Sequence, residues 1–531
     1  MTLSTRGKRR GRAGVLAFAA ILLVGLLPAS PATAAPTQAD CDGRTNNTYK
    51  KLLECVRVGQ VRQHQAAFQA IADENGGIRA AGTPGYDESV DYVVETLEAA
   101  GWNVELDEFD FTFVPPPTLR QLTPVAATYE TGIFAGTGFG EVTGNVIPVN
   151  INLTPPRASA SGCEASDFAG LDFSGPSDIA LIQRGTCNFS FKAINAEAAG
   201  AEAVIIFNQG DTPLRMDLIT GTLGGLNVVD IPVVGASFDN GVALSQPGST
   251  AFVKVDPPEE RPQVNVIAEL PGKNDDNVVM AGAHLDSVLR GPGINDNGSG
   301  SAALLELAQQ LSKLKPENTL RFAWWGAEES GLIGSTAYVN GLSQAERDRI
   351  ALYLNFDMIG SPNYIFMVYD GDESGFPAPV PVPEGSIAIE DLFESFFTLS
   401  DEPYDDAEFS GRSDYQAFIN NGIPAGGLFT GAEVPKTVEQ QAIWGGTAGA
   451  QYDPCYHLAC DTFANNNNNA LDVNSDAIAF AVLTYAYSTE TVNGVEGEKV
   501  PGKFTIPAPA GPEGTVGSGG GSAPHHDDEG S

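Results

Sequence analysis

Two histidines and a set of carboxylates in the C-terminal half of the chain have the types and order of ligands in a two-metal hydrolase. Histidine is scarce, with five residues in the whole sequence, so its placement beside carboxylates is informative. Imidazole nitrogen and carboxylate oxygen suit zinc, and two zinc ions about 3.5–4 Å apart need a bridging ligand. The sequence therefore predicts a two-zinc site built from this set: His284, Asp296, Glu328, Glu329, Asp357 and His457.

The surroundings of these residues suggest their roles. Asp296 lies in a glycine-rich loop where the backbone can bend closely, so we expect it to bridge the two ions. Of the adjacent Glu328 and Glu329, one is expected to bind zinc, while the other takes a proton from the attacking water and passes it to a leaving amine. Asp286 follows closely after His284 and is expected to orient its imidazole ring. Zinc lowers the pKa of its water toward about 7, which provides a nucleophile at neutral pH.

Apolar runs typical of strands end just before several of these residues. We expect strands at 277–281, 319–324 and 351–356, and in open α/β sheets ligands bind beyond the carboxyl ends of the strands. With a helix at 299–314, the regular alternation predicts a parallel sheet covered by helices on both faces. The expected fold class is α/β, with a mixed, mainly parallel sheet sandwiched by helices and an inserted β-rich domain.

Composition divides the chain into segments of different character. Residues 1–35 have a cationic start, an apolar run too short to span a bilayer, and small residues at the end, which predicts a cleaved secretory signal. Proline-rich breaks bound a Gly-, Thr- and Val-rich segment at 118–258, which we expect to be an inserted β domain. Residues 36–117 and 259–495 would form one discontinuous domain, and residues 505–531, rich in Gly, Pro, Ser and acids, should be disordered.

Charge and cysteine content bear on the partners and the compartment. The formal net charge of −38 repels phosphate backbones and anionic lipid, which argues against nucleic acid and membrane partners. We expect a secreted, extracellular monomer. Export favours disulfides, and although six cysteines permit many connectivities, pairing of nearest neighbours would close three short loops: Cys41–Cys55, Cys163–Cys187 and Cys455–Cys460.

Several segments resemble a known family. The resemblance is to secreted bacterial di-zinc leucyl aminopeptidases, above all the streptomycete enzyme, and it covers residues 56–111 and 262–492. It is carried by Ala283-His284-Leu285-Asp286-Ser287, by the runs 293–300, 321–329, 353–361 and 427–432, and by Cys455-Tyr456-His457. It implies a zinc exopeptidase fold and an enzyme that releases apolar N-terminal residues from peptides and protein N-termini.

The same resemblance implies a role for each site residue. It places His284 and Asp357 on one zinc, Glu329 and His457 on the other, and Asp296 between them, with a cis peptide bond after Asp296. Its remaining assignments are Glu328 as the general base, the Tyr456 hydroxyl as the stabiliser of the oxyanion, and Arg412 and Phe429 as residues of the substrate pocket. The chain departs from the relatives at Tyr415, where they have a histidine.

Two further features are implied by likeness. The inserted segment resembles a protease-associated domain through residues 183–187 and 231–234 and through its two cysteines, and such domains have no chemistry of their own. Asp472 and Asp476 match two aspartates that bind calcium in the streptomycete enzyme, whereas Cys55 stands at the position of the third.

Two alternative functions stay open at this point. An exo-carboxypeptidase of the same fold would cleave N-acylated dipeptides instead of leucyl-anilide, and a protease-associated insert also occurs in glutamate carboxypeptidases. A non-enzymatic binding protein of transferrin-receptor type would share both domains but lack metal ligands.

Overall fold

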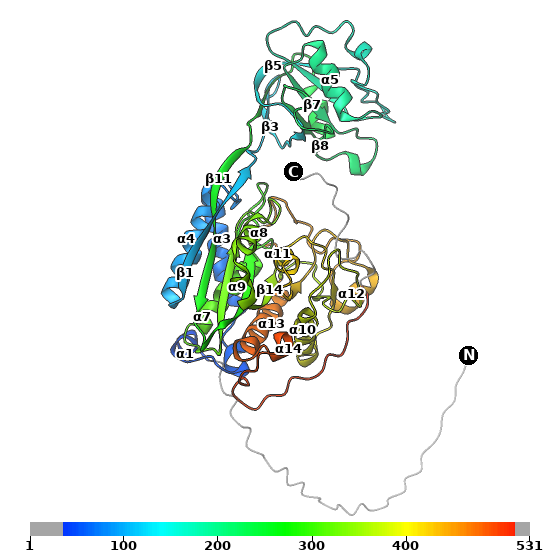
Figure 1. The fold of residues 1–531 in the computed structure, drawn as a ribbon. Coiled ribbons are helices and arrows are strands. Elements are labelled where there is room, and N and C mark those ends of the chain that lie inside the picture. The colour runs from blue at the N-terminus through cyan, green and yellow to red at the C-terminus, as the bar shows by residue number, and fades with distance from the viewer. Residues whose placement is uncertain (1–35, 516–531) are drawn as a thin grey trace, which may run out of the picture.

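The fold is built on two large β-sheets, one in each of two globular parts (Figure 1). The computed structural model describes residues 36–515, so the signal peptide expected at 1–35 and the last residues of the expected tail, 516–531, lie outside the described residues. Within the described part, no helix is both long and apolar enough to cross a membrane.

The larger part contains an eight-stranded mixed sheet. Its strand order is β1-β11-β13-β12-β14-β17-β15-β16. The four central strands β13, β12, β14 and β17 are mutually parallel. Strand β11 pairs antiparallel with both β1 and β13, and β15 pairs antiparallel with β17 but parallel with β16. This confirms the predicted mixed, mainly parallel sheet. The strands are β1 Asn103–Phe113, β11 Glu259–Leu270, β12 Asn274–His284, β13 Asn318–Trp325, β14 Ile350–Phe356, β15 Met367–Tyr369, β16 Asp405–Ala407 and β17 Ala425–Phe429.

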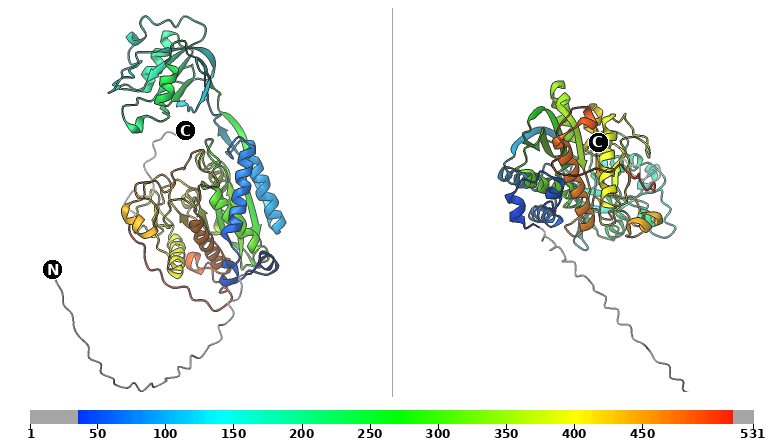
Figure 2. Two further views of the ribbon diagram at one scale, coloured as in Figure 1. Left: turned by 180° about the vertical axis from the view of Figure 1, so that it is seen from behind. Right: turned by 90° about the horizontal axis from the view of Figure 1, so that it is seen from below.

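Helices cover both faces of this sheet because its central strands carry apolar side chains on both sides. In β12, Val279 and Ala281 pack against one group of helices, whereas Val278 and Met280 pack against the other. The first face is covered by α3 Val58–Glu74, α4 Pro84–Ala100, α7 Gly298–Leu311, α10 Gly385–Ser400 and α13 Asn468–Tyr487. Figure 2 (left) shows the blue N-terminal helices and the orange-brown α13 on that face.

The opposite face is covered by fewer helices. It contacts α8 Ile333–Gly341 and α11 Tyr415–Asn420. The remaining helices of this part are short: α1 Gln38–Gly43, α2 Tyr49–Leu53, α9 Gln344–Arg349, α12 Val438–Trp444 and α14 Glu490–Asn493.

The smaller part is a β-rich module with its own core. Its seven-stranded sheet has the order β3-β2-β10-β5-β6-β7-β9, and β4 pairs with β8. The elements are β2 Thr118–Thr123, β3 Ala127–Tyr129, β4 Phe134–Ala135, β5 Gly140–Pro148, η1 Ala165–Phe168, β6 Asp178–Gln183, α5 Phe189–Ala199, β7 Ala203–Phe207, η2 Pro213–Arg215, β8 Gly221–Thr222, β9 Val233–Ala236, α6 Phe238–Leu244 and β10 Thr250–Val255.

Two paired strands connect the parts. The register of β1 and β11 continues unbroken to Phe113↔Glu259, whereas β13 pairs with β11 only as far as Val266↔Trp324. The two strands therefore extend about 23 Å past the end of that ladder, at about 3.3 Å per residue, before they reach the module. Figure 1 shows this extension as the link to the upper part.

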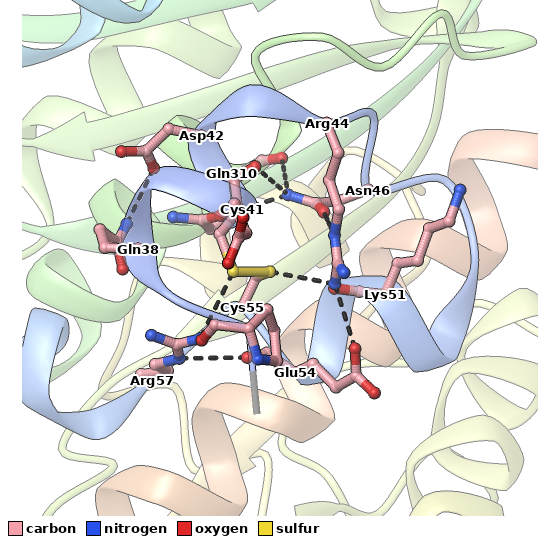
Figure 3. The surroundings of a disulfide bond; sticks show 12 residues. Gln38, Cys41, Asp42, Arg44, Asn46, Lys51, Glu54, Cys55, Arg57 and Gln310 are labelled. Atoms are coloured by element: carbon pink, nitrogen blue, oxygen red, sulfur yellow. Dashed lines mark hydrogen bonds and ion pairs between the residues drawn. A yellow bond between two sulfur atoms is a disulfide. The ribbon is translucent and has the colours of Figure 1, made fainter. Parts of the chain in front are cut away.

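A disulfide closes a loop in the N-terminal segment, and a hydrogen bond joins this loop to α7 (Figure 3). Cys41 and Cys55 are bonded, and Asn46 donates a hydrogen bond from Nδ2 to the backbone oxygen of Gln310, 3.1 Å away at the end of α7. The structure contains two further disulfides, Cys163–Cys187 and Cys455–Cys460, so all pairs are nearest neighbours.

The C-terminal segment is extended against the surface as far as Thr515. Residues 505–515, which the sequence predicted to be disordered, contain no helix or strand. They nevertheless contact the domain, because backbone nitrogens of Gly511 and Gly514 donate to the Tyr404 hydroxyl and to Asp405.

Candidate metal centre and active site

Strand ends gather the predicted ligands at one edge of the large sheet. His284 is the last residue of β12, and Asp357 directly follows β14. Glu328 and Glu329 follow β13 by a short turn. His457 comes from a separate loop between α12 and α13, and Asp296 precedes the first turn of α7.

The bridging position is visible in the distances around Asp296. Its Oδ1 lies 3.2 Å from His284 Nε2, and its Oδ2 lies 3.2 Å from His457 Nε2. On the first side, His284 Nε2 is 3.3 Å from Asp357 Oδ1. On the second side, His457 Nε2 is 3.0 Å from Glu329 Oε2. The Asp296 carboxylate thus faces two separate groups of donor atoms, each with one imidazole nitrogen and one further carboxylate oxygen.

The donor set fits metal ions. Oxygens Oε1 of Glu329 and Oδ1 of Asp357 are buried and have no hydrogen-bond partner. A buried carboxylate oxygen without a partner is costly, and a bound cation removes that cost. The mixture of imidazole and carboxylate donors is the one that zinc prefers.

The protonation equilibria point to the same need for positive charge. Burial by itself lowers the pKa of His284, but the negative charges of Glu328 and Asp357 outweigh it and hold that pKa well above its usual value. Burial raises the pKa of Glu329 to about 7 and raises the pKa of Glu328 well above the usual range. Crowded carboxylates without a cation attract protons, and a metal ion would replace them.

Residues behind the ligands hold them in position. His284 Nδ1 lies 3.2 Å from the backbone oxygen of Asp286, while the Asp286 carboxylate accepts hydrogen bonds from the backbone nitrogens of Glu328 and Glu329. Asp286 therefore positions three site residues, through its carbonyl and its carboxylate. Asp461, which sequence reasoning missed, accepts from the backbone nitrogen of Asp296 at 2.9 Å. The one sequence feature that could have drawn attention to Asp461 is its position next to Cys460.

The backbone is strained at the site. His457 itself has φ of 55°, Ala327 before Glu328 has φ of 54°, and Met358 after Asp357 has φ of 50°. Non-glycine residues with such φ values cost free energy and persist only where the surroundings fix them. At His457 the surroundings include the Cys455–Cys460 disulfide. The peptide bond after Asp296 is cis, as the sequence comparison implied.

A pocket opens over the candidate ligands. Besides the ligands it is lined by residues expected from the sequence, Arg412, Phe429 and Tyr456. It is also lined by residues that sequence reasoning did not assign to it: Met358, Tyr369, Glu408, Ser410, Ser413, Tyr415 and Ala432. Two of these, Tyr369 and Glu408, lie in or beside three-residue strands, which are too short to show a period-two pattern.

Contacts with His457 and Arg412 fix the Tyr456 side chain at the pocket. Its ring stacks on that of His457 with centroids 3.8 Å apart. Arg412 donates from Nη2 to the Tyr456 hydroxyl at 3.0 Å and from Nη1 to Glu433 at 2.8 Å. Burial and the charge of Asp296 raise the pKa of Tyr456 well above its usual value, so the hydroxyl keeps its proton and can donate it as a hydrogen bond.

The calcium pair suggested by likeness lies elsewhere, on α13. Burial and the charge of Asp472 raise the pKa of Asp476 to about 8. Among residues 36–515, no third His, Cys, Asp or Glu joins these two in a group with ligand atoms within 4.8 Å of one another. Cys55 is bonded to Cys41 and offers no free thiolate. Calcium at this pair stays a prediction.

The chain is similar to known peptidases along most of its length. Residues 265–482 match peptidase family M28, and residues 142–244 match the PA domain. An aminopeptidase of Pseudomonas aeruginosa is 50% identical over 451 residues, covering 83% of each chain. Leucine aminopeptidase 2 of Trichophyton rubrum is 46% identical over 336 residues, covering 62% of this chain and 66% of that protein.

The solved structures agree with these relatives. BSAP, a zinc aminopeptidase from Bacillus subtilis, superimposes with a TM-score of 0.56 at 25% identity and covers 80% of this chain and 94% of that one. The site geometry, the sheet and the relatives lead to one conclusion. The chain belongs to peptidase family M28, as a metallo-aminopeptidase with an inserted PA domain.

Proposed function

We propose that the chain is a co-catalytic di-zinc aminopeptidase that releases apolar N-terminal residues. The observation that carries this proposal is the position of Asp296, whose two carboxylate oxygens each lie 3.2 Å from a different imidazole nitrogen. In the proposal, His284 and Asp357 hold one zinc, Glu329 and His457 hold the other, and Asp296 bridges. When bound, the two ions polarise the scissile carbonyl and activate the attacking water.

Side chains of the pocket supply the remaining steps. Glu328 takes the proton of the attacking water on its carboxylate and delivers it to the nitrogen of the leaving amine. The Tyr456 hydroxyl donates a hydrogen bond to the oxyanion, and it is free to do so because Arg412 already donates to its oxygen.

Substrate selection follows from the walls of the pocket. The free amine of the substrate lies near the carboxylates of Glu328 and Asp357, and Ser413 Oγ fixes Asp357 by a hydrogen bond of 2.7 Å to Oδ2. Met358 and Phe429 offer apolar surface to the first side chain of the peptide. The Trichophyton relative is described as a leucine aminopeptidase, which supports an apolar preference.

The most direct test compares blocked and free substrates. We expect leucyl-p-nitroanilide to be hydrolysed, N-acetyl-leucyl-p-nitroanilide to be resistant, and metal analysis to find two zinc ions per chain. Cleavage of N-acylated dipeptides without cleavage of leucyl-anilide would instead establish the exo-carboxypeptidase alternative. Absence of both zinc and hydrolysis would favour the binding-protein alternative.

Three further proposals concern the cellular compartment of the protein, its oligomeric state and its domain boundaries. Disulfide bonds support an extracytoplasmic, secreted enzyme. We also propose that it is a monomer. The proposed domains are 36–117 with 259–495 for catalysis and 118–258 for the insert.

The insert also touches the catalytic side. Glu130 pairs with Arg290, which lies shortly after His284 in the chain, so the module contacts a loop near the pocket. Replacing the module with a Gly/Ser linker tests whether it screens substrates by size. A screening role predicts that long peptides gain in kcat/KM relative to leucyl-anilide, and equal behaviour of both substrates leaves stability as its role.

A further inference from the structure

A second group of carboxylates lies at the β15–β16 edge of the large sheet, apart from the proposed zinc ligands. Asp370 and Asp372 follow β15, Asp406 is in β16, and Glu390 and Glu394 lie one turn apart on α10. Oxygens of Asp370, Asp372 and Glu390 lie within 4.8 Å of one another, and so do oxygens of Glu390, Glu394 and Asp406. Glu390 belongs to both triads and joins them into one group, the β15–β16 acidic cluster.

No positive charge balances this cluster. Among residues 36–515, no Lys, Arg or His side chain makes an ion pair with any of its five members. Four of them are buried, and only Asp372 is exposed. Buried charges are normally paired or bound to a metal.

One atom of the cluster has no partner at all. Asp406 is 6% exposed, and its Oδ1 is buried without a hydrogen bond, although a carboxylate oxygen of Asp406 lies within 4.8 Å of oxygens of Glu390 and Glu394. Gly375 lets the loop pack closely against these carboxylates, because a Cβ there would lie 2.6 Å from Asp406 Oδ2 and 3.2 Å from Asp370 Oδ2. A cation among the carboxylates would satisfy the unpartnered Oδ1 of Asp406.

The loop after β15 has the composition of a calcium loop. Asp370, Asp372, Ser374 and Gly375 occupy the first, third, fifth and sixth positions of an Asp-x-Asp-x-Ser-Gly run, similar to the first half of an EF-hand loop. Asp370 is oriented by backbone nitrogens of Ser374 and Gly375, each at 2.9 Å. The backbone therefore turns around this carboxylate and presents it to the cluster.

Protonation equilibria agree with the geometry. Burial and the charges of Asp372 and Asp370 raise the pKa of Glu390 to about 9. Burial and neighbouring acids also raise the pKa of both Glu394 and Asp406 to about 7. The ionised cluster is unstable without a cation.

We propose that the β15–β16 acidic cluster binds Ca²⁺, with Glu390 at the centre of the site. All its donors are oxygens, and it contains no imidazole or thiolate, so it suits a hard cation with many oxygen ligands and not zinc. The exposed Asp372 gives the ion a path from solvent. The ion ties the loop after β15 and strand β16 to α10, and Tyr369, the residue before Asp370, lines the substrate pocket. Calcium thus holds the outer wall of the pocket in place.

The test uses the full zinc-loaded chain, dialysed into calcium-free buffer that contains zinc. We expect equilibrium dialysis with radioactive Ca²⁺ to find a site with a Kd of about 10⁻⁴ M. Saturating calcium should then raise the Tm on the order of 3 °C in scanning calorimetry.

Variants locate the ion within the chain. Glu390→Gln and Asp406→Asn should each weaken calcium binding at least about tenfold. The calcium-free Tm should stay equal or rise, because the neutral amides keep the shape of the acids and carry no charge. Asp372→Asn, at an exposed position, should weaken binding without risk to folding. Asp391→Asn is the matched control, since it removes an exposed charge next to Glu390 on the same helix.

Three results would overturn the proposal. The first is no calcium bound at about 10 mM, a hundred times the expected Kd. The second is an equal loss of binding in Asp391→Asn. The third is binding that survives every cluster variant and disappears in Asp476→Asn, which would place the ion on α13.

Discussion

The large domain contains two groups of buried carboxylates, and the groups differ in one kind of donor atom. At the carboxyl ends of β12, β13 and β14 the carboxylates are interleaved with two imidazoles. In the β15–β16 acidic cluster every donor is oxygen. Tyr369 points to the first region, and the adjacent Asp370 belongs to the second. Adjacent residues at the end of one strand thus serve two sites of different metal preference.

The presence or absence of two histidines is enough to change which metal each group prefers. Burial is similar in both groups, and in both it raises carboxylate pKa values. Nitrogen donors make the first group suitable for zinc, and their absence makes the second suitable for calcium.

The largest effect is expected for Glu328→Gln. The amide keeps the shape of the side chain but cannot carry the proton, so kcat should fall about 10²–10⁴-fold while two zinc ions remain bound. The measurement is kcat on leucyl-p-nitroanilide together with zinc content. Asp391→Asn, an exposed acid, is the control and should leave kcat unchanged. Near-normal turnover of Glu328→Gln would mean that the general base is another residue.

A ligand change should affect metal content as well as rate. His457→Ala removes the nitrogen that faces both Asp296 and Glu329, so zinc content should fall from two ions to one. Metal analysis after dialysis checks this. Calcium binding at the β15–β16 acidic cluster should be unaltered, and a parallel loss of both metals would show that the two regions are not independent.

Loss of the Cys455–Cys460 disulfide should reduce activity more than stability. The bond joins two cysteines that are 5 positions apart in the sequence. The short loop between them contains Tyr456 and His457, and His457 has φ of 55°. We expect Cys460→Ser to lower kcat/KM about tenfold, with a Tm change of a few degrees. The matched control is removal of the Cys41–Cys55 disulfide, which should change Tm without a comparable loss of activity.

Sequence reasoning recovered the zinc-type region because its signals are local. His284 ends the central strand β12, Asp357 directly follows β14, and Glu328 follows β13 by a short turn. All three strands are apolar runs in the sequence. The β15–β16 acidic cluster could not be found in this way. Its members come from the loop after β15, from the three-residue strand β16 and from α10. The packing of α10 and β16 against β15 brings them together.

Long helices and strands were predicted with boundaries close to those observed. The helix expected at 299–314 is α7, Gly298–Leu311, and the strand expected at 351–356 is β14, Ile350–Phe356. Asp461 was missed because its role depends on hydrogen bonds to the backbone of a distant loop. Such contacts leave no periodic trace in the sequence.

The smallest effect should come from Glu306, a buried acid in neither group. Burial raises its pKa to about 8, with smaller effects of Gln310, Asp42 and Arg57. An acid with a raised pKa in the folded state stabilises fully below its unfolded pKa, and this contribution is lost as pH rises through the folded value. His64 lies 3.9 Å away, but burial lowers its pKa to about 4, so it stays neutral across this range.

Glu306→Gln should therefore reduce the fall in Tm between about pH 5 and pH 8.5 in the zinc-loaded protein. Thermal melts of the variant and the parent across this range provide the measurement. A parent whose Tm falls no more steeply than that of the variant would show that Glu306 does not lose its proton there.

The paired strands β1 and β11 have a consequence for how the chain is made and how it can change. Since Phe113 and Glu259 are partners in one ladder, the catalytic part meets the whole PA module as a single long hairpin loop. The entropy of closing such a loop rises only about 0.6 kcal/mol for each doubling of its length. The cost in closure entropy therefore limits the size of an inserted module only weakly. The same ladder orders synthesis, because edge strand β1 finds its partner only after the ribosome has produced the entire module.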